Sequence, residues 1–202
     1  ICKLEKKDRK DYSPPPFITS TIQQAAQNVM GIPIKTTMNS LQKLYENTWI
    51  TYHRTDSEKI SDDFKKLLKV FIVKNFSKEY FQSRKIKKVK GAQDAHEAIR
   101  VTGLTDYKTI LSGKTDGLSD IDIKIYLLIL CRTVQSHMKP AIYDDLLIEL
   151  SNKTIAEHGI FHTTLSNIKF MGYLEYNTKF SQLNDIMKKK KKKKEKDKDK
   201  DK

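Results

Sequence analysis

Residues 119–138 limit most strongly what this chain can fold into, because they predict one long and almost entirely apolar helix. Residues 125–131 (IYLLILC) are the longest unbroken apolar run in the sequence. Ser119 and Asp122 have the spacing of a capping box, in which each side chain accepts a hydrogen bond from the other residue's backbone N–H. A helix needs about 20 apolar residues to cross a bilayer. The run is far shorter, so no membrane partner is predicted.

Three further helices are expected before this one, from apolar residues spaced three or four apart. They cover residues 19–30, residues 36–46 and a segment that begins after Ser61. Gly31 is a natural stop for the first, because glycine readily adopts the left-handed conformation that ends many helices. Hydroxyl side chains favour N-caps, where they accept a hydrogen bond from a free backbone N–H. The candidate caps are Thr19 or Ser20, Thr36 or Thr37, and Ser61.

Strands are expected towards the C-terminus, where aromatic and β-branched residues accumulate. The expected spans are residues 145–150, roughly 158–170, and 172–176. Together with the helices, they predict an α+β protein that is mostly helical.

The same patterns predict four segments. Residues 1–16 are charged and then proline-rich, which suits an extended lead-in. Residues 17–105 hold two short helices, a tight turn and an extended stretch, an order typical of a winged-helix (CAP-like) domain. Residues 106–180 hold the long helix and the strands. Residues 181–202 end in a low-complexity lysine and aspartate tail, which is too polar to bury a core and is predicted to be disordered.

The sequence is strongly basic, with a formal net charge of +14 at pH 7. Residues 188–202 contribute eleven lysines against four acidic residues, a net of +7, which leaves +7 for residues 1–187. This balance favours a polyanion as partner without naming one. Cys2 and Cys131 follow no disulfide or metal-ligand spacing, which fits a reduced intracellular setting. The N-terminus is charged where a signal peptide is apolar, so none is expected.

Two lysine-rich stretches each fit two roles. Residues 84–90 (RKIKKVK) alternate basic and apolar side chains, as in a phosphate-contacting edge or hairpin arm, or in a solvated edge strand. The tail after residue 188 fits a nonspecific DNA tether or an unstructured insertion.

The candidate chemistry lies in residues 49–57, WITYHRTDS. Side chains two apart share a face of an extended segment, so Tyr52, Arg54 and Asp56 are expected to line one surface. A phenol is a poor nucleophile unless a cation lowers its pKa, and a guanidinium matches two phosphate oxygens. The stretch therefore supports attack of Tyr52 on a phosphodiester, with Arg54 stabilising the charge. The alternative is a strand tyrosine beside a solvated arginine, an ordinary arrangement in a chain with nine tyrosines.

A second candidate site lies in residues 95–100, AHEAIR. On a helix, His96 and Arg100 are four residues apart and share a face. Histidine passes protons near neutral pH or donates to a phosphate. The alternative is a histidine that packs against its own helix.

Three blocks of sequence, in the same order, resemble one known family. They are residues 16–24 (PFITSTIQQ), residues 41–46 with 50–57 (LQKLYE and ITYHRTDS), and residues 95–100. The blocks resemble those around the nucleophile of type IA DNA topoisomerases. Three collinear blocks are far more specific than one. The resemblance spans about residues 14–176 and identifies the chain as the tyrosine-bearing portion of such an enzyme.

The resemblance implies a role for each candidate residue. Tyr52 would be the covalent nucleophile, Arg54 the phosphate stabiliser and Asp56 an orienting carboxylate. His96 and Arg100 would contact DNA phosphates near the cleaved bond. It also implies that the later strands and the end of the lead-in belong to the arch domain of these enzymes.

In that family, the tyrosine cuts one strand of underwound DNA and forms a 5′-phosphotyrosyl link. Another strand passes through the break, and the 3′-hydroxyl reseals it, which relaxes negative supercoils. No nucleotide triphosphate is needed, and no P-loop pattern is present in this sequence. The implied partners are single-stranded or underwound DNA and the remaining topoisomerase domains, in a DNA-containing compartment of the cell.

The implied cofactor is Mg²⁺, held by a TOPRIM domain that we do not find in this sequence. The chain alone is therefore expected to bind single strands weakly, with strong salt dependence, and not to relax DNA. Asp120 and Asp122 have a spacing used by TOPRIM carboxylates, but they precede a helix and are interpreted as its cap, so no metal site is predicted. One departure is Val101, where the family usually has proline.

Two alternatives to this function stay open. The first is a non-enzymatic winged-helix module that binds nucleic acid through residues 85–90 and the tail. The second is a subunit whose TOPRIM half is a separate chain.

Overall fold

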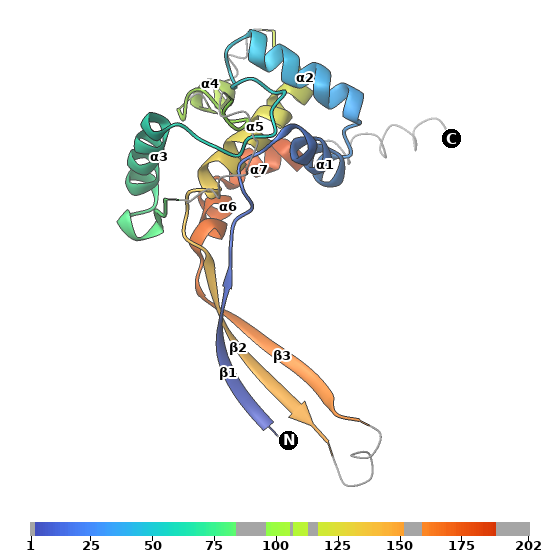
Figure 1. Ribbon diagram of the computed structural model, residues 1–202, viewed down its shortest axis with the longest axis vertical. Helices are drawn as coiled ribbons and strands as arrows, with labels where there is room; N and C mark the ends of the chain where they lie inside the picture. Colours follow the sequence, from blue (N-terminus) through green and yellow to red (C-terminus); the bar gives the residue numbers. More distant parts are fainter. Residues whose placement is uncertain (1–2, 84–95, 106, 113–116, 152–158, 189–202) are drawn as a thin grey trace, which may run out of the picture.

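The computed structural model describes residues 3–83, 96–105, 107–112, 117–151 and 159–188. These residues form a helical head and a long three-stranded arm that extends away from it (Figure 1). The chain runs along the arm first, builds most of the head, returns to the arm as two strands and finishes in the head. The mixture of helices and a sheet agrees with the predicted α+β class.

Helix α5 (Asp120–Gln135) lies at the centre of the head. It packs against α1 (Thr19–Met30) and α2 (Ile34–Glu46). Its apolar side chains are buried on several sides, as expected of a helix that is apolar nearly all round. Ser119 caps it, and the capping box between Ser119 and Asp122 is formed. The long helix and its capping box are thus confirmed.

The helices expected before α5 are present, but two of the predicted N-caps are wrong. Gly31 separates α1 from α2 with a φ of 67°, the left-handed conformation predicted for a helix stop. The N-cap residues are Ile18 for α1 and Pro33 for α2. Proline presets the backbone angle from which a helix can start. The Thr19 hydroxyl donates instead to the carbonyl oxygen of His53, in another loop.

Helix α3 (Asp62–Asn75) begins after Ser61, as predicted from that serine and the two aspartates behind it. A short 3₁₀ turn, η1 (Lys78–Tyr80), follows it, and a five-residue helix, α4 (Tyr107–Leu111), precedes α5. The buried side chains of α3 repeat every three or four residues, as in an amphipathic helix. They are Phe64, Leu68, Phe71 and Ile72.

The arm is one antiparallel sheet in the order β1-β2-β3. Its strands are β1 (Lys3–Asp11), β2 (Ala141–Leu150) and β3 (Phe161–Phe170). Lys3 lies opposite Glu149, and the pairing continues without a break to the end of β1. The N-terminal segment expected to be extended is therefore an edge strand, paired with residues far away in the sequence.

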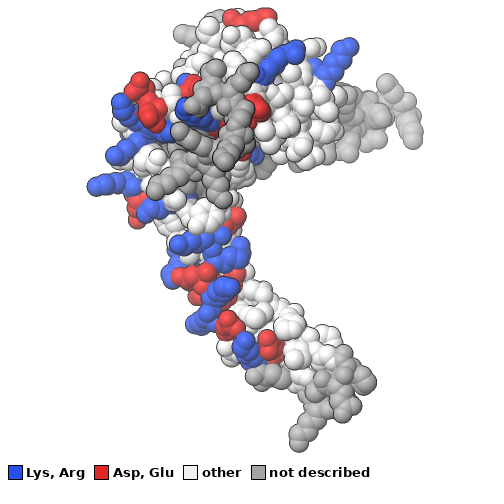
Figure 2. All heavy atoms as spheres, viewed as in Figure 1, with Lys and Arg blue, Asp and Glu red and all other residues white. Residues whose placement is uncertain are grey.

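The two faces of the arm differ, because successive side chains of a strand point to opposite faces. On one face, Arg9 pairs with Asp145 at 2.6 Å and lies over the ring of Tyr143. Figure 2 shows charged side chains crowded on the part of the arm nearer the head and continuing, more sparsely, along one edge towards its tip. The other face carries, by its register, the apolar residues Leu4, Leu146, Ile148, Leu150, Phe161 and Leu165.

The last predicted strand, residues 172–176, is wrong. The chain there forms the 3₁₀ turn η2 (Gly172–Leu174) and the helices α6 (Glu175–Lys179) and α7 (Ser181–Lys188). Helix α7 packs against α5 and thus returns the chain to the head. Aromatic content alone indicated a strand, but burial of these side chains in the head is achieved by helices.

Gly172 explains why the strand stops. Its φ is 53°, and a Cβ at this position would lie 2.3 Å from the backbone oxygen of Pro140. Only glycine allows both the left-handed backbone and this close approach. The next residue, Tyr173, donates from its hydroxyl to Asp11 at 2.9 Å, and its carbonyl oxygen accepts from Gln135. This joint therefore ties both edges of the arm to the head.

The predicted winged-helix domain stays a prediction. Among the described residues of its span, the strand pairing consists of isolated bridges, such as those of Phe17 with Ile99 and Ile50 with Val101. The two lysine-rich stretches, residues 84–90 and the tail from residue 189, lie outside the described residues, so the roles weighed for them stay open. The predicted boundary after residue 105 coincides with no break in packing, because α5 packs on α2. No helix in the described ranges is long and apolar enough to span a membrane.

Candidate active site around Tyr52

The loop that carries Tyr52 is not a regular strand. The extended run expected over residues 49–54 ends at Ile50, which bridges Val101, and bends follow it. Exposure nevertheless alternates along the loop. The side chains of Tyr52, Arg54 and Asp56 are exposed, whereas the two residues between them are buried. The three candidate side chains therefore all reach solvent, and Arg54 and Asp56 share one groove.

Two threonines hold the loop in place: Thr51, directly before Tyr52, and Thr19, which binds the backbone after it. Thr51 donates from its hydroxyl to the carbonyl oxygen of Ala98 at 2.7 Å and accepts from the backbone N–H of Arg100 at 3.0 Å. Thr19, in the first turn of α1, donates to the carbonyl oxygens of His53 and Thr55 at 2.8 and 3.0 Å. The Thr19 hydroxyl also accepts from the Thr55 backbone N–H.

These contacts join three segments that are far apart in sequence. A short loop fixed at both ends loses little further freedom when a ligand binds, so its side chains are presented in a defined position. The blocks that showed the resemblance are the segments that meet here: the start of α1, the Tyr52 loop and residues 96–101.

The ring of Tyr52 lies among three other rings and keeps 39% of its surface exposed. Its centroid is 5.2 Å from that of Tyr45, at the end of α2, and 5.5 Å from that of His53. It is 5.8 Å from that of His96. The two closer contacts are edge-to-face, a geometry that favours the interaction of ring edges with ring faces. The phenol is supported by neighbouring rings and still reaches solvent.

Beside this ring is an open groove with a volume of about 550 Å³. Arg54, Asp56 and His96 line it, together with Thr55 and the first residues of α1. The backbone at a helix start carries partial positive charge, which adds to the charge of Arg54. Tyr52 stands at the border of this groove through its contact with His96. The groove therefore suits an anionic ligand held beside the phenol.

The segment of His96 and Arg100 is not helical, so the two residues do not share a helix face as expected. His96 is exposed in the groove. The Arg100 side chain is only 12% exposed, pairs with Glu97 and lies 3.9 Å from the ring centre of Phe64. It also donates to the backbone oxygen of Val101, the position where the family pattern differs. Arg100 thus holds the backbone of this segment.

Glu97 connects the same segment to α3. Its carboxylate accepts a hydrogen bond from the backbone N–H of Ser61, the N-cap of α3, and pairs with Arg100. Burial would raise its pKa, but the bond from Ser61 and the charge of Arg100 outweigh burial, so the pKa of Glu97 is lowered. The ion pair therefore persists over the neutral range and fixes the segment that presents His96.

His53 is a residue of this site that the sequence analysis did not select. It is 1% exposed and touches the rings of both Tyr45 and Tyr52. Burial, followed by the charge of Arg54, lowers its pKa, although the Glu46 carboxylate acts in the opposite direction. The signal that could have found it is the two-residue spacing itself, which places residue 53 opposite the exposed face.

Known proteins that resemble this chain show which family it belongs to. The family model described as DNA topoisomerase matches residues 1–201 of the chain. The chain belongs to the type IA DNA topoisomerase family. It is 39% identical over 184 residues to DNA topoisomerase 1 of Campylobacter jejuni, a match that covers 86% of this chain and 25% of that protein. It is 36% identical over 181 residues to the prokaryotic-type DNA topoisomerase 1 of Acanthamoeba polyphaga mimivirus, covering 87% and 21% of the two.

A solved structure agrees with these relatives. Full-length topoisomerase I from Thermotoga maritima matches with a TM-score of 0.71 and 32% identity, over 86% of this chain and 28% of that one. The chain thus spans about a quarter of the length of the topoisomerases it matches. The predicted family and the mixed fold are confirmed.

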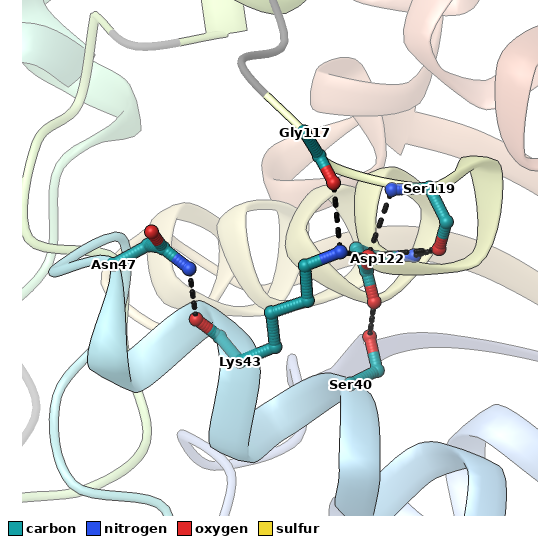
Figure 3. Close-up of polar contacts among 6 residues, drawn as sticks. All are labelled: Ser40, Lys43, Asn47, Gly117, Ser119 and Asp122. Carbon is teal, nitrogen blue, oxygen red and sulfur yellow. Dashed lines mark hydrogen bonds and ion pairs between the residues drawn. The ribbon is translucent and has the colours of Figure 1, made fainter.

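No residues of the described part of this topoisomerase chain form a metal centre. No group of three or more histidine, cysteine or acidic side chains that could hold a metal ion is found there. Asp122, the carboxylate with TOPRIM-like spacing, is engaged in another way (Figure 3). It accepts from the backbone of Ser119 at 2.8 Å and from the Ser40 hydroxyl at 2.7 Å, and it pairs with Lys43 at 3.0 Å. Asp122 therefore caps α5 and ties it to α2.

Proposed function

We propose that this chain is the tyrosine-bearing portion of a type IA DNA topoisomerase, in which Tyr52 attacks a phosphodiester of single-stranded DNA. The observation that carries the proposal is the exposed phenol at the border of a groove lined by Arg54 and His96. An arginine and a histidine beside an accessible hydroxyl suit a phosphate more than any neutral ligand. The family of the chain makes DNA the expected substrate.

In the proposed step, the Tyr52 oxygen forms a bond to phosphorus as the bond from phosphorus to the 3′-oxygen breaks. The phenolic proton ends on the departing 3′-hydroxyl, and the DNA 5′-phosphate stays on the tyrosine. Arg54 stabilises the charge that builds up on the phosphate oxygens. The reverse reaction reseals the strand, and because the link conserves the phosphodiester energy, no nucleotide triphosphate is consumed.

The other groove residues take supporting roles in this proposal. Asp56 lines the same groove and orients the guanidinium of Arg54. His96 donates to a neighbouring phosphate, for which its exposed position is suited. A direct phosphate contact by Arg100 requires its guanidinium to leave Glu97, so its main proposed role is to hold the segment that presents His96.

Relaxation of negative supercoils is proposed for the whole protein and requires domains beyond this chain. The described residues contain no cluster of three or more metal-binding side chains, so we assign the Mg²⁺ implied by the family to a TOPRIM domain and derive no step from it. The 202-residue chain alone is expected to bind single strands weakly and to leave supercoils unchanged. Tight, salt-insensitive binding by the isolated chain would contradict this view.

The test uses the whole protein with a single-stranded oligonucleotide and magnesium, followed by denaturing electrophoresis. With a 3′-end label, radioactivity should remain attached to the protein, whereas a 5′-end label should be released on a shorter fragment. Tyr52→Phe should abolish the adduct and leave the affinity for DNA within about twofold, because only the nucleophilic oxygen is lost.

Tyr45 offers a matched control, because it has the same 39% exposure as Tyr52 and touches it. Tyr45→Phe keeps the ring and should keep the adduct. An adduct that survives Tyr52→Phe would show that another residue is the nucleophile. Binding without any adduct in the unaltered protein would favour the alternative, a non-enzymatic winged-helix binder.

A further inference from the structure

A histidine is buried directly behind the exposed phenol. His53 is 1% exposed, and its Nδ1 atom is buried without a hydrogen-bond partner among the described residues. Buried polar atoms are nearly always paired, so an unpaired one in a native site calls for a functional explanation. An apolar side chain of the same size would fill the space without leaving a polar atom unpaired.

The surroundings of His53 consist of rings. Its centroid is 5.5 Å from that of Tyr52 and 6.1 Å from that of Tyr45, which are themselves 5.2 Å apart. We call these three residues the aromatic triangle. His96 contacts the Tyr52 ring from the groove, at 5.8 Å. The tyrosine ring is therefore held by Tyr45 and His53 within the protein and by His96 at the groove.

The backbone of His53 is fixed as well. Its carbonyl oxygen accepts the hydroxyl hydrogen of Thr19 at 2.8 Å, so the residue is attached to the first turn of α1. A side chain that is buried, attached through its backbone and flanked by two rings has little freedom to move. It can determine where the Tyr52 ring stands relative to the groove.

We propose that His53 is a positioning residue that, as a neutral ring, holds the phenol of Tyr52 at the border of the groove. The inference rests on the proposed function of Tyr52 as nucleophile. In this view His53 acts by packing against the Tyr52 ring, and no proton transfer through it is invoked.

The charge state of His53 follows from the groups around it. Burial, and then the positive charge of Arg54 in its own loop, lower its pKa from the ordinary value of 6.5. From α2, the Glu46 carboxylate opposes this shift, and Tyr45 contributes a ring. His96 is in contact with the Tyr52 ring as well. The neutral imidazole is thus the stable form at pH 7, and an imidazolium would have to leave the aromatic triangle to reach water.

The first experiment measures adduct formation and DNA affinity for three forms of the whole protein at pH 7.5. His53→Ala removes one wall of the triangle and should slow adduct formation about tenfold with affinity unchanged, as expected for the loss of edge-to-face contacts. His53→Phe keeps a ring and should restore the rate to within about threefold of the original. Equal rates in all three forms, or a Phe variant as slow as the Ala variant, would overturn the proposal.

The second experiment needs no DNA cleavage. 3-Fluorotyrosine is placed at position 52, and its ¹⁹F resonance is followed from pH 7.5 down to pH 5. The resonance should shift with a midpoint below 6.5, and His53→Phe should remove that shift. Fluorotyrosine at Tyr12, which is 61% exposed, serves as the control and should not show this titration.

The two experiments separate the proposals. A titration that persists unchanged in His53→Phe would show that His53 does not position the ring. If the titration follows His53 but no adduct forms in the unaltered protein, then the nucleophile proposal fails while the positioning of Tyr52 by His53 stands. Should the Ala variant not fold, the ¹⁹F titration of His53→Phe compared with that of the unaltered protein decides the matter.

Discussion

The head and the arm of this topoisomerase chain are built by different physical means. The head surrounds α5, whose side chains Ile125, Ile129 and Tyr126 are entirely buried. In the arm, nearly every residue of β1 and β3 is exposed, and β2 is only partly covered. The head is therefore stabilised mainly by removal of apolar surface from water, and the arm mainly by its backbone ladder.

Cross-strand charges add to the ladder in the arm. Arg9, which is half exposed, pairs with the mostly covered Asp145, and Lys169 pairs with Asp8 at 3.0 Å between two exposed side chains. Exposed pairs contribute little and weaken with salt. The candidate site lies wholly in the head, where three segments are fixed by partly buried hydrogen bonds. The candidate side chains are therefore held in place by the part of the molecule in which the most apolar surface is buried.

The largest expected effect comes from emptying the head core. Ile129→Ala, at a position with 0% exposure, should lower the free energy of unfolding by about 2–5 kcal/mol, because it removes buried methyl groups and leaves a cavity. Leu165→Ala, in the arm at 55% exposure, should change it by less than about 0.5 kcal/mol. Urea unfolding measures both. Similar losses at the two positions would contradict the contrast drawn between head and arm.

A smaller effect is expected at the joint between the two regions. Gly172→Ala puts a Cβ against the Pro140 backbone and forces a left-handed alanine, so we expect a loss of about 1–3 kcal/mol or more. Gly31 has a similar φ of 67°, but no atom lies within 4 Å of an added Cβ. Gly31→Ala therefore measures the destabilisation caused by the left-handed backbone alone. Thermal unfolding of both variants should show the larger loss for Gly172. Equal losses would mean that the backbone around Gly172 and Pro140 shifts easily to accommodate the added Cβ.

The smallest effect concerns charged groups and also depends on pH. Asp122→Asn turns an amide towards the Lys43 ammonium and should lower stability by about 1–3 kcal/mol. Burial raises the pKa of Asp122, but bonds from Ser40, Ser119 and Lys43 outweigh burial and lower it below 3.8. Its carboxylate therefore contributes fully above that pH and loses its contribution as the pH falls below it.

The unfolding of Asp122→Asn and the unaltered protein should thus converge in acid, below about pH 3.8. Asp145→Asn in the arm should have a smaller effect, and one that salt reduces, because its partner Arg9 is half exposed. A difference between Asp122→Asn and the original protein that is constant from pH 7 to pH 2 would show that the carboxylate charge is not what stabilises this contact.

Local sequence patterns predicted most of the helices and the family. The capping box at Ser119, the stop at Gly31 and the start after Ser61 depend on neighbouring residues only, and all three are present. The caps of α1 and α2 were wrong because Thr19 serves a distant loop and Pro33 takes the position of a cap. The strand expected at residues 172–176 was wrong because packing against the head overrode a strand-like composition.

The sequence alone singled out Tyr52, Arg54 and Asp56 as candidate residues and predicted the alternation of exposure along their loop. The spacing of Tyr52, Arg54 and Asp56 was enough to predict that all three are exposed while the residues between them are buried, because side-chain direction along a short segment is a local property. Which residues support these side chains from within the protein was decided only by the tertiary structure. The burial of His53, the bonds from Thr19 and the pairing of Arg100 with Glu97 all join segments far apart in the chain. Such contacts depend on the path of the whole backbone, which no local pattern encodes.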